Sequence, residues 1–532
     1  MNNSRKILVP LVAALFLIFG MMLGLFLNKG KSPLIGGEND KYGKKLADIF
    51  DIIDKNYVDS INKDDLFEKT VSELLHNLDP HSNYIAARDL KEMTESIQGQ
   101  FGGVGIRFTV FDDTLNVVNV IENSPSEREG IQKFDQIIEV NGENIAGVKI
   151  SNDRVRELLK GTVGSKVTVQ IKRKNQTFEK TIIRGNVPIT SLNAAYMMTE
   201  DIAYMQLTQF SLTSANEFYL AASNLKSQGM KSLILDLRYN GGGVMSSAVS
   251  ILEAFLPKGA KIVSTKGKNT PEEIIYAQSQ PFLKDINLVV LINTNSASAS
   301  EIVAGAIQDN DRGTIIGRRS FGKGLVQQDI QLKDGSDLRL TISRYYTPTG
   351  RSIQKPYSNG TYEEYLMDEV NRYESGELYK LDSSLFVDSL KYTTPKGKVV
   401  YGGGGIMPDI FVPLDTLDYS SYYRRLKYAN AFNEFSYAYA RKNNLNQYTN
   451  LVDFDKRFVV SQKILDDFVA FASKKFSISL FRNDYQHSLQ RIKTDLKAEI
   501  ARQRWLENGA FYIFNQRDKD IEKAVEVLKK EK

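Results

Sequence analysis

The chain has 532 residues, of which 42% are hydrophobic and 25% charged, and its formal net charge is +5. This globular composition excludes a wholly disordered chain, a collagen-like fibre and a multi-span membrane protein, and the length predicts about three or four domains. Because there is no cysteine, few histidines and no long basic run, we expect no disulfide, metal, cofactor or nucleic-acid partner.

An apolar run occupies residues 7–27, preceded by Arg5 and Lys6. As a helix it would extend roughly 30 Å, enough to cross a bilayer. The run ends at Leu25-Phe26-Leu27, which is a poor cleavage site. Residues 1–30 are therefore interpreted as an uncleaved signal anchor, and a cleaved signal is the alternative. We therefore expect a single-pass protein of an inner membrane, with most of the chain in the periplasm or otherwise outside the cytoplasm.

Apolar residues recur at helical spacing in residues 38–96. We predict a helical segment there, with a turn at residues 79–82. Residues 97–185 follow with a glycine-rich loop, short alternating strands and an Asn141-Gly142 turn, which predict a compact β-rich unit.

Strands and helices alternate from residue 186 to residue 415. The continuous apolar strands at residues 232–237 and 288–293 predict an α/β domain with a buried parallel sheet. Residues 357–394 interrupt this pattern and are interpreted as an insertion. Residues 416–532 are predicted to be a charged, helical extension that packs against the domain or assembles the protein into homo-oligomers.

A group of serines follows the second of these buried strands, where a helix is predicted to begin near Ser298. Backbone N–H groups at a helix N-terminus favour developing negative charge, so a nucleophilic serine suits this position. Helix capping alone is the alternative.

A serine nucleophile needs a base, and the scarcity of histidine directs attention to lysine. Lys323 lies in a glycine turn before an alternating strand, and Gln327 follows four residues later. Residues two apart share a strand face, so both side chains can point to one site. A buried lysine can be neutral and act as a base; a solvated turn lysine is the alternative.

Asp236 to Gly243 ends a predicted buried strand with three glycines. Such strand ends bind ligands in α/β sheets, and glycine N–H groups there can form an oxyanion hole; a plain turn is the alternative. Residues 317–323 are a near match to a phosphate-binding loop but lack its final Ser or Thr. Residues 320–323 match the S-x-x-K motif of penicillin-binding enzymes, but that motif lies on a helix and the glycines here argue against one. Residues 309–311 resemble part of a calcium-binding loop but lack its remaining ligand positions, so they are interpreted as a turn at a helix end.

These stretches together resemble the carboxyl-terminal processing proteases, also called tail-specific proteases. The resemblance covers residues 45–356 and 395–415 and includes Leu78 to Ser82, Gly102 to Ile106, Ser296 to Glu301, Gly322 to Gln327, and Tyr346 to Gln354. It implies a multidomain fold. Its parts would be an anchor (1–30), an N-terminal helical segment (38–96), a PDZ domain (97–185), a crotonase-like α/β serine protease core (186–415, insertion 357–394) and a helical C-terminal extension (416–532).

The same resemblance implies the site residues. Ser298 would be the nucleophile, Lys323 the general base and Gln327 the residue that positions the lysine. Backbone N–H groups of Gly242 and Ala299 would form the oxyanion hole. His81 belongs to a family motif but is interpreted as a structural residue.

For the PDZ domain the resemblance implies capture of a free C-terminal carboxylate by the loop Gly102, Gly103, Val104, Gly105 and Ile106, with an apolar last residue in an adjacent pocket. The partners would be protein or peptide substrates with free, apolar C-termini. The leading interpretation is a membrane-anchored serine endopeptidase of unstructured extracytoplasmic proteins. The alternative is a catalytically silent PDZ adaptor or scaffold at the membrane.

Overall fold

A computed structural model describes residues 41–357, 362–381 and 387–530. The predicted membrane anchor, residues 1–30, lies outside the described residues. Among the residues described, no helix is long and apolar enough to span a bilayer. The chain divides into two units, Met1–Glu73 and Leu74–Lys532.

The described part of the first unit consists of helix α2 (Lys41–Asn56) and the start of α3 (Lys63–His76). Phe50 and Phe67 face each other with ring centroids 6.2 Å apart, and Lys63 pairs with Asp54 at 2.7 Å. The predicted helical segment is not wholly helical, because strand β1 (Asn83–Ile85) precedes α4 (Ala87–Gln98). The strand forms because its backbone pairs with residues 337–339, far along the chain.

Residues 100–188, the PDZ unit, are built mainly of antiparallel strands. Its sheet has the order β3-β4-β5-β7-β8, with β6 on β5, and β2 pairs with β9. The strands and helices are β2 (Gln100–Gly103), β3 (Ile106–Phe111), β4 (Thr114–Val120), α5 (Pro125–Arg128), β5 (Gln136–Val140), β6 (Glu143–Asn144), α6 (Asn152–Leu159), β7 (Lys166–Arg173), β8 (Gln176–Ile183) and β9 (Gly185–Pro188). Alternate residues of β7, Val167, Val169 and Ile171, are fully buried, as the period of a half-buried strand requires.

The α/β core, residues 192–411, contains a sheet of order β10-β11-β12-β15-β16-β21, in which only the β10–β11 pair is antiparallel. Its strands are β10 (Leu192–Met197), β11 (Ile202–Leu207), β12 (Ser232–Asp236), β15 (Asn287–Ile292), β16 (Thr314–Gly317) and β21 (Ile410–Phe411). All residues of β11 and β12 are buried, because helices cover both faces of this sheet.

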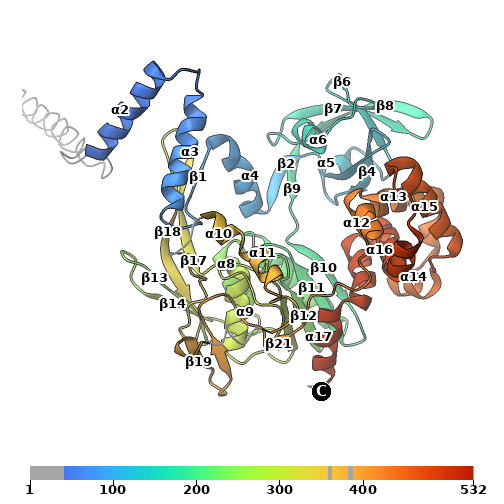
Figure 1. The fold of residues 1–532 in the computed structure, drawn as a ribbon. Coiled ribbons are helices and arrows are strands. Elements are labelled where there is room, and N and C mark those ends of the chain that lie inside the picture. The colour runs from blue at the N-terminus through green and yellow to red at the C-terminus, as the bar shows by residue number, and fades with distance from the viewer. Residues whose placement is uncertain (1–40, 358–361, 382–386, 531–532) are drawn as a thin grey trace, which may run out of the picture. The chain divides into compact units, whose positions relative to one another are not determined.

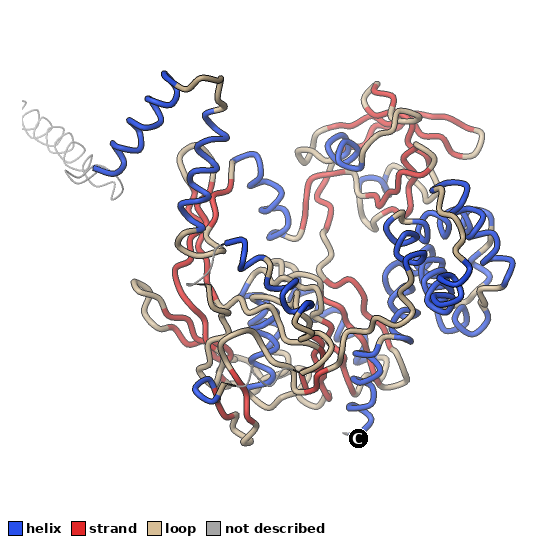
Figure 2. Tube along the Cα trace, in the orientation of Figure 1, coloured by secondary structure: helices blue, strands red, loops and turns tan. Residues whose placement is uncertain are grey.

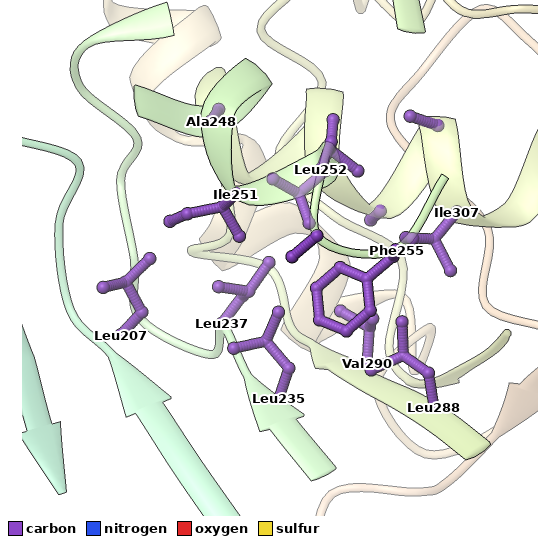
Figure 3. Close-up of a cluster of buried hydrophobic side chains, with 14 of the residues drawn as sticks. Leu207, Leu235, Leu237, Ala248, Ile251, Leu252, Phe255, Leu288, Val290 and Ile307 are labelled. Carbon is purple, nitrogen blue, oxygen red and sulfur yellow. The ribbon is translucent and has the colours of Figure 1, made fainter. Parts of the chain in front are cut away.

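One face of the sheet is covered by α7 (Ser214–Ser227), α8 (Met245–Leu252) and α9 (Ala299–Asp309). Figure 3 shows Ile251 and Leu252 of α8 next to Leu237, and these residues belong to one buried cluster with Ala248 and Leu235. The opposite face is covered by the C-terminal helix α17 (Lys519–Lys530), whose Ile521, Ala524 and Leu528 pack with sheet residues including Tyr204 and Ile234. The end of the C-terminal extension is therefore part of the core of this domain.

A second sheet of the α/β core has the order β1-β18-β13-β14, with β17 paired to β18. Its remaining strands are β13 (Lys261–Lys266), β14 (Glu273–Tyr276), β17 (Leu325–Gln331) and β18 (Asp337–Tyr346). The predicted insertion contains α10 (Tyr362–Leu366), α11 (Asp368–Glu374) and β19 (Lys391–Thr393), which pairs with β20 (Val399–Tyr401).

The helical region, residues 421–530, contains α12 (Ser421–Tyr428), α13 (Ala431–Lys442), α14 (Leu451–Arg457), α15 (Gln462–Phe476), α16 (Arg482–Phe514) and α17. Helices α12 to α16 (Figures 1 and 2) share a core rich in aromatic rings. Helix α16 is interrupted at Trp505 and Leu506, whose backbone dihedrals are not helical. The region contacts the PDZ unit through Tyr437, which is buried against Phe111 and Phe134.

Candidate active site

A cavity of about 550 Å³ lies where the first and second sheets of the α/β core meet. Of the residues predicted for catalysis, it is lined by Ser298, Ala299, Lys323, Gln327 and Gly242. The structure therefore places all of them around one space. Helix α4 contributes a wall that was not predicted: Met93, Ser96 and Ile97.

Ser298 stands at the turn between β15 and α9, immediately before the first residue of the helix. Its backbone has φ 56° and ψ −114°, a left-handed conformation that costs a non-glycine residue about 1–3 kcal/mol. Its N–H donates to Oε2 of Glu301 at 2.9 Å, which holds the residue in this conformation. The partial positive charge of the α9 N-terminus lies at the same place and favours an oxyanion.

Lys323 lies in the loop between β16 and β17, and its Nζ donates to Oε1 of Gln327 at 3.0 Å. Burial lowers the pKa of Lys323, and the positive charge of Arg339 lowers it further, whereas Glu301 and Asp79 oppose the shift. A lowered pKa makes the neutral amine available at lower pH, as a general base requires.

The orientation of Gln327 depends on the predicted turn at residues 79–82. Its Nε2 donates to the carbonyl oxygen of His81. Asp79 holds that turn, because its Oδ1 accepts from the His81 N–H at 2.8 Å and its Oδ2 from the Ser82 hydroxyl at 2.6 Å. With its amide nitrogen fixed, Gln327 presents its oxygen to Lys323.

The His81 side chain is separate from this relay. Its Nε2 lies 2.8 Å from the Tyr365 hydroxyl. Burial, with the nearby charge of Lys323, lowers the pKa of His81 to about 3, although Asp79 acts in the opposite direction. The imidazole is therefore neutral at physiological pH.

Two buried residues that the sequence reasoning did not select connect the loops of the site. The carboxylate of Glu301 accepts from Ser298 N, from Lys323 N at 2.8 Å and from Gly322 N at 2.7 Å. The Tyr345 hydroxyl lies within hydrogen-bonding distance of the carbonyl oxygens of Ser298 and Lys323. The S-x-x-E spacing of a capping box was the available signal for Glu301; nothing local indicated Tyr345.

Gly242 is packed directly against Ser298. A Cβ at this residue would lie 2.7 Å from Ser298 Cβ and 2.9 Å from Ala299 N, and its φ is 99°, so only glycine fits. Its N–H donates to Oδ1 of Asn240 at 2.9 Å. In this structure a substrate oxyanion would therefore have to replace Asn240 as the acceptor of that hydrogen bond.

Residues of the insertion support the loop that carries Lys323, a contact that its sequence did not reveal. Arg372 of α11 is buried and donates to the carbonyl oxygens of Ser320 at 2.8 Å and Phe321 at 3.1 Å. Lys355 pairs with Asp368 at 2.9 Å. The insertion is thus a part of the framework of the site.

Three of the five predicted carboxylate-binding residues lie around a different cavity, in the PDZ unit. Val104, Gly105 and Ile106 line it, whereas Gly102 and Gly103 belong to strand β2 and pair with β9. Gly105 has φ 85°, and a Cβ there would lie 2.2 Å from Ser124 Cβ. Glycine is therefore required for the loop to approach Ser124.

Comparisons with protein families divide the chain along similar lines. Residues 201–365 match the model of peptidase family S41, and residues 102–183 match that of the PDZ domain. Residues 422–506 match a family of unknown function.

Several curated proteins are similar to this chain over about two thirds of its length. The carboxy-terminal-processing protease of Bartonella bacilliformis is 36% identical over 351 residues, which is 64% of this chain and 80% of that protein. The carboxy-terminal processing protease CtpA of Bacillus subtilis is 31% identical over 358 residues, or 66% of this chain and 76% of that protein. Among solved structures, a photosystem II D1 C-terminal processing protease is 26% identical, with TM-score 0.33, over 58% of this chain and 89% of that one.

Proposed function

Because the chain belongs to the carboxy-terminal processing proteases, serine peptidases of family S41 with a PDZ domain, we propose that Ser298 and Lys323 form its catalytic dyad. The observation that carries this proposal is the single cavity that Ser298, Lys323, Gln327 and Gly242 line. The lowered pKa of Lys323 and its hydrogen bond to Gln327 support the role of a base.

In the proposed reaction, neutral Lys323 takes the proton of the Ser298 hydroxyl as the oxygen attacks the scissile carbonyl carbon. The resulting oxyanion accepts from the Ala299 N–H at the start of α9 and from Gly242 N–H after the latter leaves Asn240. Lys323 then gives its proton to the leaving amine, and the C–N bond breaks to leave an ester on Ser298. Water, deprotonated by Lys323, hydrolyses that ester.

The proposed substrates are unstructured extracytoplasmic proteins whose free C-terminus binds the PDZ domain. The edge strand β3 offers a place for an added strand, and the glycine loop at its start offers N–H groups to a carboxylate. The apolar run at residues 7–27 supports anchoring in an inner membrane with the catalytic part outside the cytoplasm. This combination would confine cleavage to proteins that reach the membrane surface.

Ser298→Ala and Lys323→Ala test the dyad. Each variant should cut an unstructured peptide substrate at least about 1,000-fold more slowly than the wild type, while peptide binding and the unfolding temperature stay the same. Ser227→Ala serves as the control, because the exposed Ser227 hydroxyl donates to Asn224 O within α7 and does not line the cavity. Wild-type cleavage by either dyad variant would refute the assignment, and binding without cleavage by the wild type would favour a PDZ adaptor.

A further inference from the structure

The peptide groove of the PDZ domain is lined by PDZ residues, by Glu92 of α4 and by residues of the helical region. It is a cavity of about 860 Å³ between β3 and α6. Its PDZ side includes Ile106, Phe108 and Leu159. Its other side comes from the helical region, with lining residues Asn430, Asn433, Arg502, Leu506 and Glu507. Figure 1 shows the helices of this region beside the PDZ unit.

Strand β3 determines which residues of a bound tail would face the helical region. Ile106, Phe108 and Val110 pack on the PDZ core, whereas Arg107 is exposed on the other side of the strand. A peptide added to β3 alternates its side chains in the same way. If its last side chain enters the apolar pocket, the penultimate side chain lies on the side of Arg107.

Arg107 meets the helical region at this side of the groove. The closest carboxylate oxygen to its Nη1 is Oε1 of Glu507, at 3.6 Å, which is longer than a hydrogen bond. The other oxygen of Glu507 is held by Arg502, and Arg502 also donates to Glu499 at 2.9 Å. The Arg107 side chain is 44% exposed, and its guanidinium thus retains donors for a further acceptor in the groove.

The helical region reaches the groove through the interruption of α16. Leu506 has φ 51° and ψ −140° within a helix, a conformation that leucine adopts only at an energetic cost. Leu506 itself lines the groove, so the interruption of α16 coincides with the proposed binding surface.

We propose that the helical region forms part of the substrate site, and that Arg107 and Arg502 together favour an acidic residue at the penultimate position of the substrate tail. This inference rests on the proposed recognition of a free C-terminus. It adds a second determinant of specificity, supplied by a region outside both the peptidase and the PDZ domain.

The test measures binding to the full chain carrying Ser298→Ala by fluorescence anisotropy at low salt. The probes are fluorescein-labelled decapeptides that end in valine and carry glutamate, glutamine or lysine at the penultimate position. We expect the glutamate peptide to bind about fivefold more tightly than the lysine peptide. An amidated form of each peptide measures the need for a free carboxylate separately.

Two charge changes in the helical region should act in opposite directions. Arg502→Gln removes the cation from Glu499 and leaves Glu507 with Arg107 alone, so the preference for glutamate should fall below about twofold. Glu507→Gln removes the carboxylate that competes for Arg107, so the preference should exceed about tenfold. Misfolding cannot produce both results. Arg504→Gln is the matched control, since Arg504 contacts Leu445 O and does not line the groove.

An unchanged preference in both Arg502→Gln and Glu507→Gln would overturn the inference while leaving the recognition of a free C-terminus intact. Equal binding of the free-acid and amidated peptides would instead refute that recognition, and with it the strand register on which the inference depends. A fivefold preference that Arg504→Gln abolishes as readily as Arg502→Gln would also contradict the proposed contact.

Discussion

At the scale of single residues, the buried carboxylate of Glu301 holds the loops of the active site together. It accepts hydrogen bonds from backbone N–H groups on both sides of the dyad and from the Ser320 hydroxyl. The negative charge of Glu301 also raises the pKa of Lys323. Glu301 is therefore a positioning residue that acts on geometry and on the pKa of Lys323 at once.

The pH dependence of cleavage should separate these two effects. In the proposed mechanism Lys323 acts as a base when neutral, so we expect activity to rise as pH increases through the pKa of Lys323. Arg339 lowers that pKa and Glu301 raises it. We therefore expect Arg339→Gln to move the acid limb of kcat/KM to higher pH, and Glu301→Gln to move it to lower pH with a lower kcat.

Arg344→Gln is the control for Arg339→Gln, because Arg344 lies on the same strand and interacts with Tyr357 rather than with the dyad. Profiles of kcat/KM against pH for the variants provide the measurement. If the acid limb of the kcat/KM profile of Arg339→Gln coincided with that of the wild type, Arg339 would not set the pKa of the base.

At the scale of secondary-structure elements, the C-terminal helix α17 completes the α/β core. Its first turn brings Asp520 to Arg238 at 2.8 Å and to Arg318 at 2.6 Å, and all three side chains are buried. Arg238 lies two residues before Asn240 in the strand-end loop. The end of the chain thus supports the loop that leads to Gly242.

Asp520→Ala should destabilise the protein by about 3–5 kcal/mol, because it leaves two buried guanidinium groups without one of their carboxylates. Glu522→Ala, in the same helix, should change stability by less than about 1 kcal/mol, since its pair with Lys519 is exposed. Chemical denaturation of the two variants measures the difference. Equal stability of Asp520→Ala and the wild type would show that α17 does not hold this loop.

The elements that could be predicted from the sequence are those with strong local patterns. The continuous apolar residues at 232–237 and 288–293 predict buried strands, and β12 and β15 lie there. Strand β1 could not be predicted, since it forms by pairing with β18 more than 250 residues later. The site divides in the same way into residues that a local pattern predicts and residues that it does not. Ser298, Lys323 and Gln327 were predicted from motifs. Glu301 and Tyr345 connect the loops of the site through contacts with residues that are distant in the sequence.

At the scale of the whole molecule, the PDZ unit and the helical region are joined by buried contacts. Tyr437 donates to Oδ1 of Asn116 at 3.1 Å, and its ring packs against Phe111 and Phe134. Lys475 pairs with Asp112 at 2.8 Å at the edge of this interface. These contacts keep the helical region next to the cavity that is the proposed peptide groove.

Tyr437→Ala should weaken this interface, because it removes a fully buried ring at an expected cost of about 3–5 kcal/mol. Hydrogen exchange should become faster in β4 and α13 and stay unchanged in β12 of the α/β core. Tyr428→Ala, at a residue 90% exposed in α12, is the control. Unchanged exchange in β4 would mean that the two parts are held together by other contacts.

The central claim is that one chain combines recognition of a free C-terminus with cleavage by Ser298. The most direct measurement compares two forms of one unstructured peptide with an apolar last residue, one with a free carboxylate and one amidated. Both are incubated with the wild-type chain and with Ser298→Ala. We predict cleavage of the free-acid form alone, and only by the wild type. Equal cleavage of both forms, or cleavage that persists in Ser298→Ala, would contradict the account.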